Sequence, residues 1–260
     1  MPRFVLLSIL GCFWLAPVAQ ALTLTPLVDG RYVSSNAQLC AQVGNTVSCT
    51  GTGNPATVPS TPFSQFDGTA DDPGIGGTFA GSFVAKQDSS IGATSMEGTG
   101  SVALSLEDLR YSGNAASAFV ISFALDEAAL VSFHGDFAFA STAPFSDLSF
   151  GGTIFWINVN LCTGGCAPGN PAQTLEDHYL SVDRHVPDAP TAAIVFDRVL
   201  APGQYNFSLS AYGQQMSFLE ATNTASYSFD LGVAPVPEPS GAALAAALVA
   251  LVAARRRALR

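Results

Sequence analysis

The sequence has little charge and almost no lysine. Of its 260 residues only 12% are charged, about half the roughly 25% of an ordinary globular domain, and Lys86 is the single lysine. A formal net charge of -10 excludes a nucleic-acid partner, because such binding needs a basic surface. Lys86 does not follow a glycine-rich loop, which excludes a P-loop nucleotidase. Hydrophobic residues nevertheless make up 48% of the chain, so it can build a core and is not of the disordered type.

The sequence also lacks familiar catalytic motifs. It contains neither a G-x-S-x-G nucleophile elbow nor an H-E-x-x-H zinc motif. Asp177-His178 and Asp183-Arg184-His185 could meet to form a metal or acid–base site, or could lie separately on exposed loops. Adjacent acidic pairs such as Glu107-Asp108 point to opposite faces of a strand, so they do not define the carboxylate pair of a glycosidase. These residues predict a protein that is not an enzyme, and a hydrolase with an unrecognised site is an alternative.

The positive charge that is present gathers at the two ends. Half of the ten basic residues are terminal, namely Arg3, Arg255, Arg256, Arg257 and Arg260. Between Leu22 and Pro237, five basic residues face nineteen acidic ones, a net charge of -14. The chain is therefore an acidic body between two apolar, arginine-flanked ends.

The N-terminal end predicts a secretory signal peptide over residues 1–21. Met1–Arg3 is a short positive start, Phe4–Leu15 is an apolar run, and Ala19-Gln20-Ala21 is a small-residue cleavage motif. We therefore expect export through the Sec translocon and a mature chain that begins at Leu22. A buried N-terminal helix is the alternative.

The C-terminal end predicts a short membrane helix over residues 240–254. Gly241–Ala254 is uncharged, but as a helix it covers only about 21 Å of a hydrocarbon core of roughly 30 Å. Ser240 can lengthen the span, and the arginines that follow can snorkel to the interface. Their charge keeps the end cytoplasmic and places the body outside the inner membrane. A soluble core helix is the alternative.

The segment before this helix carries a recognisable signal. Val236, Pro237, Glu238, Pro239 and Ser240, then the apolar helix, then Arg255, Arg256 and Arg257, closely resemble the PEP-CTERM sorting signal, and the resemblance covers residues 234–260. It implies a Gram-negative bacterium that makes extracellular polysaccharide, a precursor held transiently in the inner membrane, and cleavage near Pro-Glu-Pro by an exosortase. A permanent anchor is the alternative. Residues 22–233 would form the exported domain, with extracellular polysaccharide as a possible partner.

The sequence of residues 22–233 predicts an all-β fold, an antiparallel β-sandwich of the jelly-roll kind. Large and small residues alternate with period 2 in several segments, and turn signals separate these segments. Large residues alternate with small ones in three segments, around Phe119–Leu125, Tyr205–Ala211 and Tyr227–Leu231. Further strands are expected over 78–86, 101–106, 130–140, 149–160, 178–183 and 192–200. Turns are expected at 67–68, 72–74, 112–114, 168–171 and 201–203, with a long loop over 50–62.

The cysteines fit an oxidising compartment. After removal of Cys12 with the signal peptide, four remain, which pair most simply as Cys40 with Cys49 and Cys162 with Cys166, one of three connectivities. A structural zinc site is the competing interpretation, although eight residues between Cys40 and Cys49 fit it poorly.

Two further patterns bear on ligands. Asp67, Asp71 and Asp72 are expected to lie in a glycine-containing loop that could bind calcium, and a solvated acidic turn is the plainer interpretation. Trp156 lies in an apolar run, so we expect it to be buried in the core. We therefore expect an exported structural or adhesive protein without a cofactor. A carbohydrate-binding module is the alternative, and an exposed row of aromatic side chains on one sheet would favour it.

Overall fold

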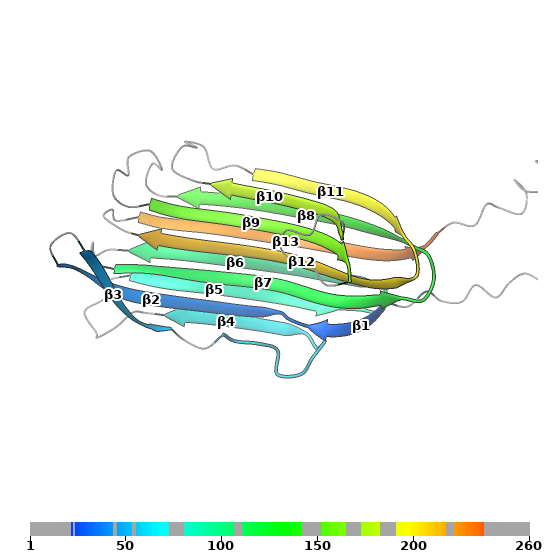
Figure 1. Ribbon diagram of the computed structural model, residues 1–260, viewed down its shortest axis with the longest axis horizontal. Coiled ribbons are helices and arrows are strands. Elements are labelled where there is room, and N and C mark those ends of the chain that lie inside the picture. Colours follow the sequence, from blue (N-terminus) through cyan, green and yellow to red (C-terminus); the bar gives the residue numbers. More distant parts are fainter. Residues whose placement is uncertain are drawn as a thin grey trace, which may run out of the picture.

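The computed structural model describes residues 22, 24–43, 46–53, 56–72, 81–106, 111–141, 152–164, 173–182, 191–216 and 221–236. Every regular element in this part of the chain is a β-strand (Figure 1). The thirteen strands are β1 (Leu24–Asp29), β2 (Tyr32–Val43), β3 (Thr46–Gly53), β4 (Phe66–Asp72), β5 (Gly81–Ile91), β6 (Ser95–Leu106), β7 (Tyr111–Leu125), β8 (Ala129–Ser141), β9 (Gly152–Thr163), β10 (Thr174–Val182), β11 (Thr191–Leu200), β12 (Gly203–Met216) and β13 (Ala221–Pro235).

The strands form two antiparallel sheets that pack as a sandwich. Sheet A has the order β10-β9-β12-β7-β2-β3, and sheet B has the order β11-β8-β13-β6-β5-β4. From β6 onward the pairing is nested, because β6 pairs with β13, β7 with β12, β8 with β11 and β9 with β10. β1 continues the line of β2 along the same edge of β7, and Gly30 and Arg31 separate the two strands.

The space between the sheets holds one hydrophobic core rich in phenylalanine. Phe119, Phe133, Phe207 and Phe229 form its centre, with ring centroids 4.7 Å apart for Phe119 and Phe229 and 5.4 Å apart for Phe133 and Phe207. Several rings lie directly over glycines of neighbouring strands. Tyr227, for example, covers Gly100, its register partner on β6. Large rings over glycines fill the interior without forcing the sheets apart.

The sequence predicted nine of these strands. The three strongly alternating segments lie in β7, β12 and β13, with their large side chains buried, and the other six lie in β5, β6 and β8–β11 with shifted ends. The prediction missed β1 to β4. The expected turns at 67–68 and 112–114 are wrong, because these residues lie inside β4 and β7, whereas the chain does reverse at 201–202 between β11 and β12. The turn predicted at 168–171 lies outside the described residues.

The predicted ends of the domain fall partly outside the described residues. Residues 1–21 and 237–260 are not described, so the signal peptide and the helix at 240–254 stay predictions. Leu22, the predicted mature start, is buried against the core. β13 runs to Pro235, two residues past the boundary predicted at 233. No helix capable of crossing a bilayer occurs within the described ranges.

Candidate functional site

The outer face of sheet A carries a pair of stacked aromatic rings. Trp156 of β9 and Tyr212 of β12 are direct register partners, and their rings stack at 4.1 Å between centroids with 18° between planes. Trp156 is half-buried, so the expectation that it lies in the core is wrong. Its neighbours Phe155 and Ile157 take the inward positions, and alternation places Trp156 outward.

The register partners on the two flanks of this pair are small, although Ala116 on the Tyr212 side is itself buried. Ser181 of β10 lies opposite Trp156, and Ala116 of β7 lies opposite Tyr212. Two more aromatic residues lie in the neighbouring row of register partners, two residues along the strands. Tyr179 of β10 is 59% exposed at one end of that row, and Tyr32 of β2 is half-buried at its other end. These four aromatic residues, which we call the aromatic band, extend over strands β10 to β2. The band spans four inter-strand spacings, or about 19 Å.

The polar groups around the aromatic band are amides and hydroxyls. The outward positions of β9, β12, β7 and β2 beside the rings hold Asn158, Asn160, Ser208, Ser210, Gln214, Asn114, Ser34 and Asn36. Two of their oxygens, Oδ1 of Asn158 and Oδ1 of Asn36, are buried and have no hydrogen-bond partner in the described part of the chain. A buried acceptor without a donor is costly to the fold. Burial also raises the pKa of Tyr212, which keeps its hydroxyl neutral.

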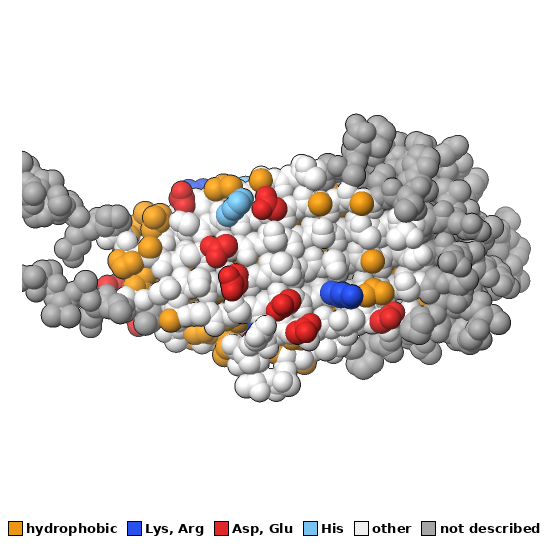
Figure 2. Space-filling model, turned by 180° about the vertical axis from the view of Figure 1, so that it is seen from behind, with side chains coloured by type: hydrophobic (Ala, Val, Ile, Leu, Met, Phe, Trp, Pro, Cys, Tyr) orange, Lys and Arg blue, Asp and Glu red, His pale blue; other side chains and the backbone are white. Residues whose placement is uncertain are grey.

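The two outer faces of the sandwich differ sharply in charge. Among the described outward-facing residues of sheet A, Asp177 is the only charged one. The outer face of sheet B instead carries seven exposed carboxylates against Lys86. Figure 2 shows acidic side chains spread over a surface on which most of the described side chains are neither charged nor hydrophobic. The seven are Asp67, Asp71, Asp88, Glu97, Asp136, Asp197 and Asp230. The electrostatic potential that acts on a charged ligand should therefore differ strongly between the two faces.

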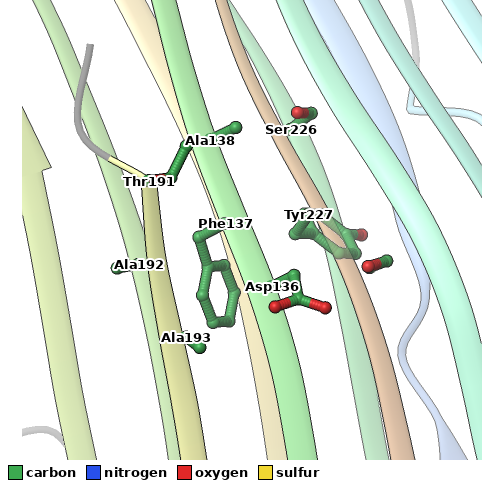
Figure 3. Close-up of a pocket in the computed structure, with 9 residues that line it drawn as sticks. Asp136, Phe137, Ala138, Thr191, Ala192, Ala193, Ser226 and Tyr227 are labelled. Atoms are coloured by element: carbon green, nitrogen blue, oxygen red, sulfur yellow. The ribbon is translucent and has the colours of Figure 1, made fainter.

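The outer face of sheet B is hollowed in two places. One hollow of about 520 Å³ lies over β8, β11 and β13, where the carboxylate of Asp136 stands among the small side chains of Ala138, Ala193 and Ser226 (Figure 3). A second, of about 330 Å³, lies beside Asp88, Glu97 and Thr99, and both reach Ser228. Asp136 is 66% exposed, so water screens it.

The expected calcium loop is a strand instead. Asp67, Asp71 and Asp72 all belong to β4, whose side chains alternate between exposed and buried. Asp67 and Asp71 face outward, four residues or about 13 Å apart along the strand. Asp72 faces inward, where its Oδ2 accepts a hydrogen bond from the backbone N–H of Ala37. The three carboxylates therefore do not converge, and the described residues contain no cluster of three such ligands.

His178 belongs to an ion-pair cluster that joins the two sheets at one side. Its Nε2 lies 3.1 Å from Oε2 of Glu176, and Arg198 of β11 donates to the other oxygen of the same carboxylate. The ring of His178 also stacks on Phe196 of β11. Asp177, the neighbour considered in the sequence, faces outward, and residues 183–185 lie outside the described residues. The cluster therefore links β10 of sheet A to β11 of sheet B.

The cysteines agree with an oxidised protein as far as they are described. Cys162 is buried and disulfide-bonded, and its predicted partner Cys166 lies outside the described residues. On the hairpin of β2 and β3, the backbone register places Cys40 directly opposite Cys49. Of the predicted sorting residues, only Val236 is described, directly after β13. Ala19, Ala21, Pro237, Glu238, Pro239, Ser240 and the arginines 255–257 lie outside the described ranges.

Comparisons with known proteins add little. No protein-family model matches the chain, and no curated protein matches it in sequence. Among solved structures, the chain has a similarity to a chain in the structure of the infectious bursal disease virus Gx strain. The identity is 12%, 85% of this chain and 66% of that chain are covered, and the TM-score is 0.18. So low a score supports no inference about fold or function.

Proposed function

We propose that this protein is an exported, non-enzymatic adhesion protein of the cell envelope or extracellular matrix, and that it binds polysaccharide through the outer face of sheet A. The observation that carries the proposal is the stack of Trp156 on Tyr212 within an uncharged polar face. Flat ring faces pack against the C–H faces of sugar rings, while amides and hydroxyls offer both donors and acceptors to sugar hydroxyl groups.

The aromatic band favours a chain-like ligand. Its length of about 19 Å across the strands suits an extended oligosaccharide better than a single small molecule. The near absence of charge among the described residues of this face favours an uncharged polysaccharide. An anionic one would gain no ion pairs there and would be repelled by a molecule whose body carries a net charge of -14 between Leu22 and Pro237.

The strand order supports a rigid surface beneath the aromatic band. We assign β6 to β13 to a jelly roll, on the strength of the four nested pairs from β6–β13 inward to β9–β10. In such a fold the middle strands are held on both sides, so β9 and β12 present Trp156 and Tyr212 from a rigid surface. Rigid placement lowers the entropic cost of binding.

A glycan array incubated with the full-length protein tests the binding proposal. We expect retention on uncharged polysaccharides, and loss of that retention in the variant Trp156→Ala. Thr99→Ala, on the outer face of sheet B, is the matched control and should bind as the parent does. Retention on no glycan, or equal retention by the Trp156→Ala variant, would overturn the proposal.

The route of export is proposed separately, from the resemblance of residues 234–260 to the PEP-CTERM signal. In this proposal the Sec translocon exports the chain, the helix at 240–254 holds it in the inner membrane, and an exosortase cleaves near Pro237–Pro239. Intact-mass analysis of protein from its native host tests it. A chain from Leu22 to an end near Pro237–Pro239 would support the route, and a chain that retains Arg255–Arg257 would contradict it.

A further inference from the structure

We infer that β11 is a self-association edge, on which a second copy of this chain pairs through its own β11 to join two sandwiches side by side. In the described part of the chain β11 is the terminal strand of sheet B, hydrogen-bonded to β8 on one side (Figure 1). The free side of an edge strand presents unpaired N–H and C=O groups, which form a template for another strand.

The other sheet edges are better protected against such pairing. β10 carries a register shift between Thr174 and Glu176, and bulges of this kind disrupt a ladder. β4 displays the charges of Asp67 and Asp71, and the hydroxyl of Thr57, from the preceding loop, donates to the carbonyl of Thr69 within β4. β3 contains Gly51 and Gly53, which weaken strand pairing. β11 carries the charges of Asp197 and Arg198, but it contains no glycine or proline and keeps an unbroken ten-residue register with β8.

β11 also exposes apolar side chains in a pattern suited to pairing. Val195 is 66% exposed and Val199 is 64% exposed, both on the outer face of sheet B. β-branched residues stabilise strands when they pack against a neighbour across the ladder. In the single copy, the far sides of these two valines have no such neighbour within the described residues.

The charges of β11 exclude some antiparallel registers, and its β-branched residues favour one of those that remain. With Val195 on the two-fold axis, Val195 meets its own copy and Asp197 meets Ala193. Arg198 then lies opposite Ala192, and no like charges face each other. A register centred on Asp197 would place two carboxylates in direct opposition, which is destabilising. The register centred on Val195 avoids this opposition and also pairs Val195 with its copy and Val199 with Thr191, all of them β-branched, so it is the register that we expect.

Such a dimer would be bivalent. The two-fold axis of such a pair is perpendicular to the sheet and keeps corresponding faces on the same side, so both sheet A outer faces would point the same way. Two weak sites presented together gain avidity on a repetitive ligand. The self-association itself does not depend on the proposed polysaccharide binding and is tested without any glycan.

Cysteine cross-linking of the full-length protein tests the pairing directly. Directly opposed residues of antiparallel strands have Cα atoms about 4.5–5.5 Å apart, within the range that a disulfide bridges. We expect Val195→Cys to form a disulfide-linked dimer on a non-reducing gel, at least ten times more than Val58→Cys. Val58, a loop valine 59% exposed, is the matched control. Equal cross-linking of the two variants would overturn the proposal.

A second measurement keeps the test independent of disulfide formation. The double variant Val195→Lys/Val199→Lys adds charge to an already exposed surface and should fold normally, as circular dichroism can verify. We expect sedimentation of the full-length parent to show a dimer and that of this variant a monomer, with Val58→Lys behaving as the parent. A parent that is monomeric at high micromolar concentration, or a double variant that stays dimeric, would also overturn the pairing.

Discussion

Arg31 and Asp29 form a two-point ion pair inside the sandwich, with Nη2 2.7 Å from Oδ2 and Nε 2.9 Å from Oδ1. Both side chains are almost fully buried. Arg31 also donates to the carbonyl oxygens of Ser89 on β5 and Ser64 in the loop before β4, and its guanidinium lies 5.7 Å from the ring centroid of Phe66. One side chain from the junction of β1 and β2 therefore ties sheet A to sheet B.

Removing this arginine should be severely destabilising. We expect Arg31→Met to lower the free energy of unfolding by about 3–5 kcal/mol, because Asp29 would remain buried without its partner. Urea denaturation of the parent and the variant measures the difference. Arg198→Met is the control, since Arg198 is 52% exposed and its ion pair with Glu176 should contribute less than about 1 kcal/mol. Similar losses in the two variants would contradict the structural role of Arg31.

The same ion pair predicts a dependence of stability on pH. Burial by itself would raise the pKa of Asp29, but hydrogen bonds from Arg31 and from the N–H groups of Phe63 and Arg31 outweigh it and lower the pKa below 3.8. A carboxylate with a lowered folded pKa contributes stability above its unfolded pKa and loses it as the pH falls through the folded one. The gap in unfolding free energy between the parent and Asp29→Asn should therefore narrow below pH 3.8. A gap that stays constant across that range would show that Asp29 is not ionised in the fold.

The covering of glycines by aromatic rings gives a third prediction. A Cβ at Gly100 would collide with the ring of Tyr227, whereas a Cβ at Gly232 of the neighbouring strand would meet nothing within 4 Å. We expect Gly100→Ala to cost about 1–3 kcal/mol through overpacking. Gly232→Ala should be neutral or slightly stabilising, because alanine loses less backbone entropy than glycine. Thermal unfolding of both variants measures the contrast, and equal stabilities would be inconsistent with this packing.

The fold was predictable in strands whose two faces differ clearly in residue size and polarity. In β7, β12 and β13 large apolar residues alternate with smaller ones, so the buried face is visible in the sequence. β2 and β4 gave no such signal because their inward positions hold small or polar residues, among them Ser35 and Ala37 in β2 and Gly68 and Asp72 in β4. Asp67-Gly68 resembles a turn locally, but pairing with β5 holds it extended.

The sequence shows which aromatic and polar residues the candidate site contains, but not how they are arranged in space. The apolar run around Trp156 indicated burial, and alternation between two faces was the signal that could have placed it outward. Its contact with Tyr212, 56 positions later in the chain, depends on the register of β9 with β12, which local sequence does not specify. The burial of Arg31 likewise depends on distant partners such as Ser89.

The disulfide pattern is a fourth prediction. Cys162 is disulfide-bonded, and the register of β2 with β3 sets Cys40 opposite Cys49. A non-reducing proteolytic digest of the protein should therefore yield Cys162 linked to Cys166 and Cys40 linked to Cys49. Mass spectrometry identifies the linked peptides. A peptide that joins Cys49 to Cys162 would contradict this pairing.

The affinity for an uncharged polysaccharide at low and high salt tests the central proposal most directly. Binding through the stacked rings and amides of the aromatic band should change little with ionic strength, because it involves no ion pairs. The double variant Trp156→Ala/Tyr212→Ala should bind at least tenfold more weakly, a loss of about 1.4 kcal/mol or more. Affinity electrophoresis in a gel that contains the polysaccharide, with Thr99→Ala as control, measures both effects. Undiminished binding by the double variant, or binding by the parent that disappears at high salt, would contradict the proposed site.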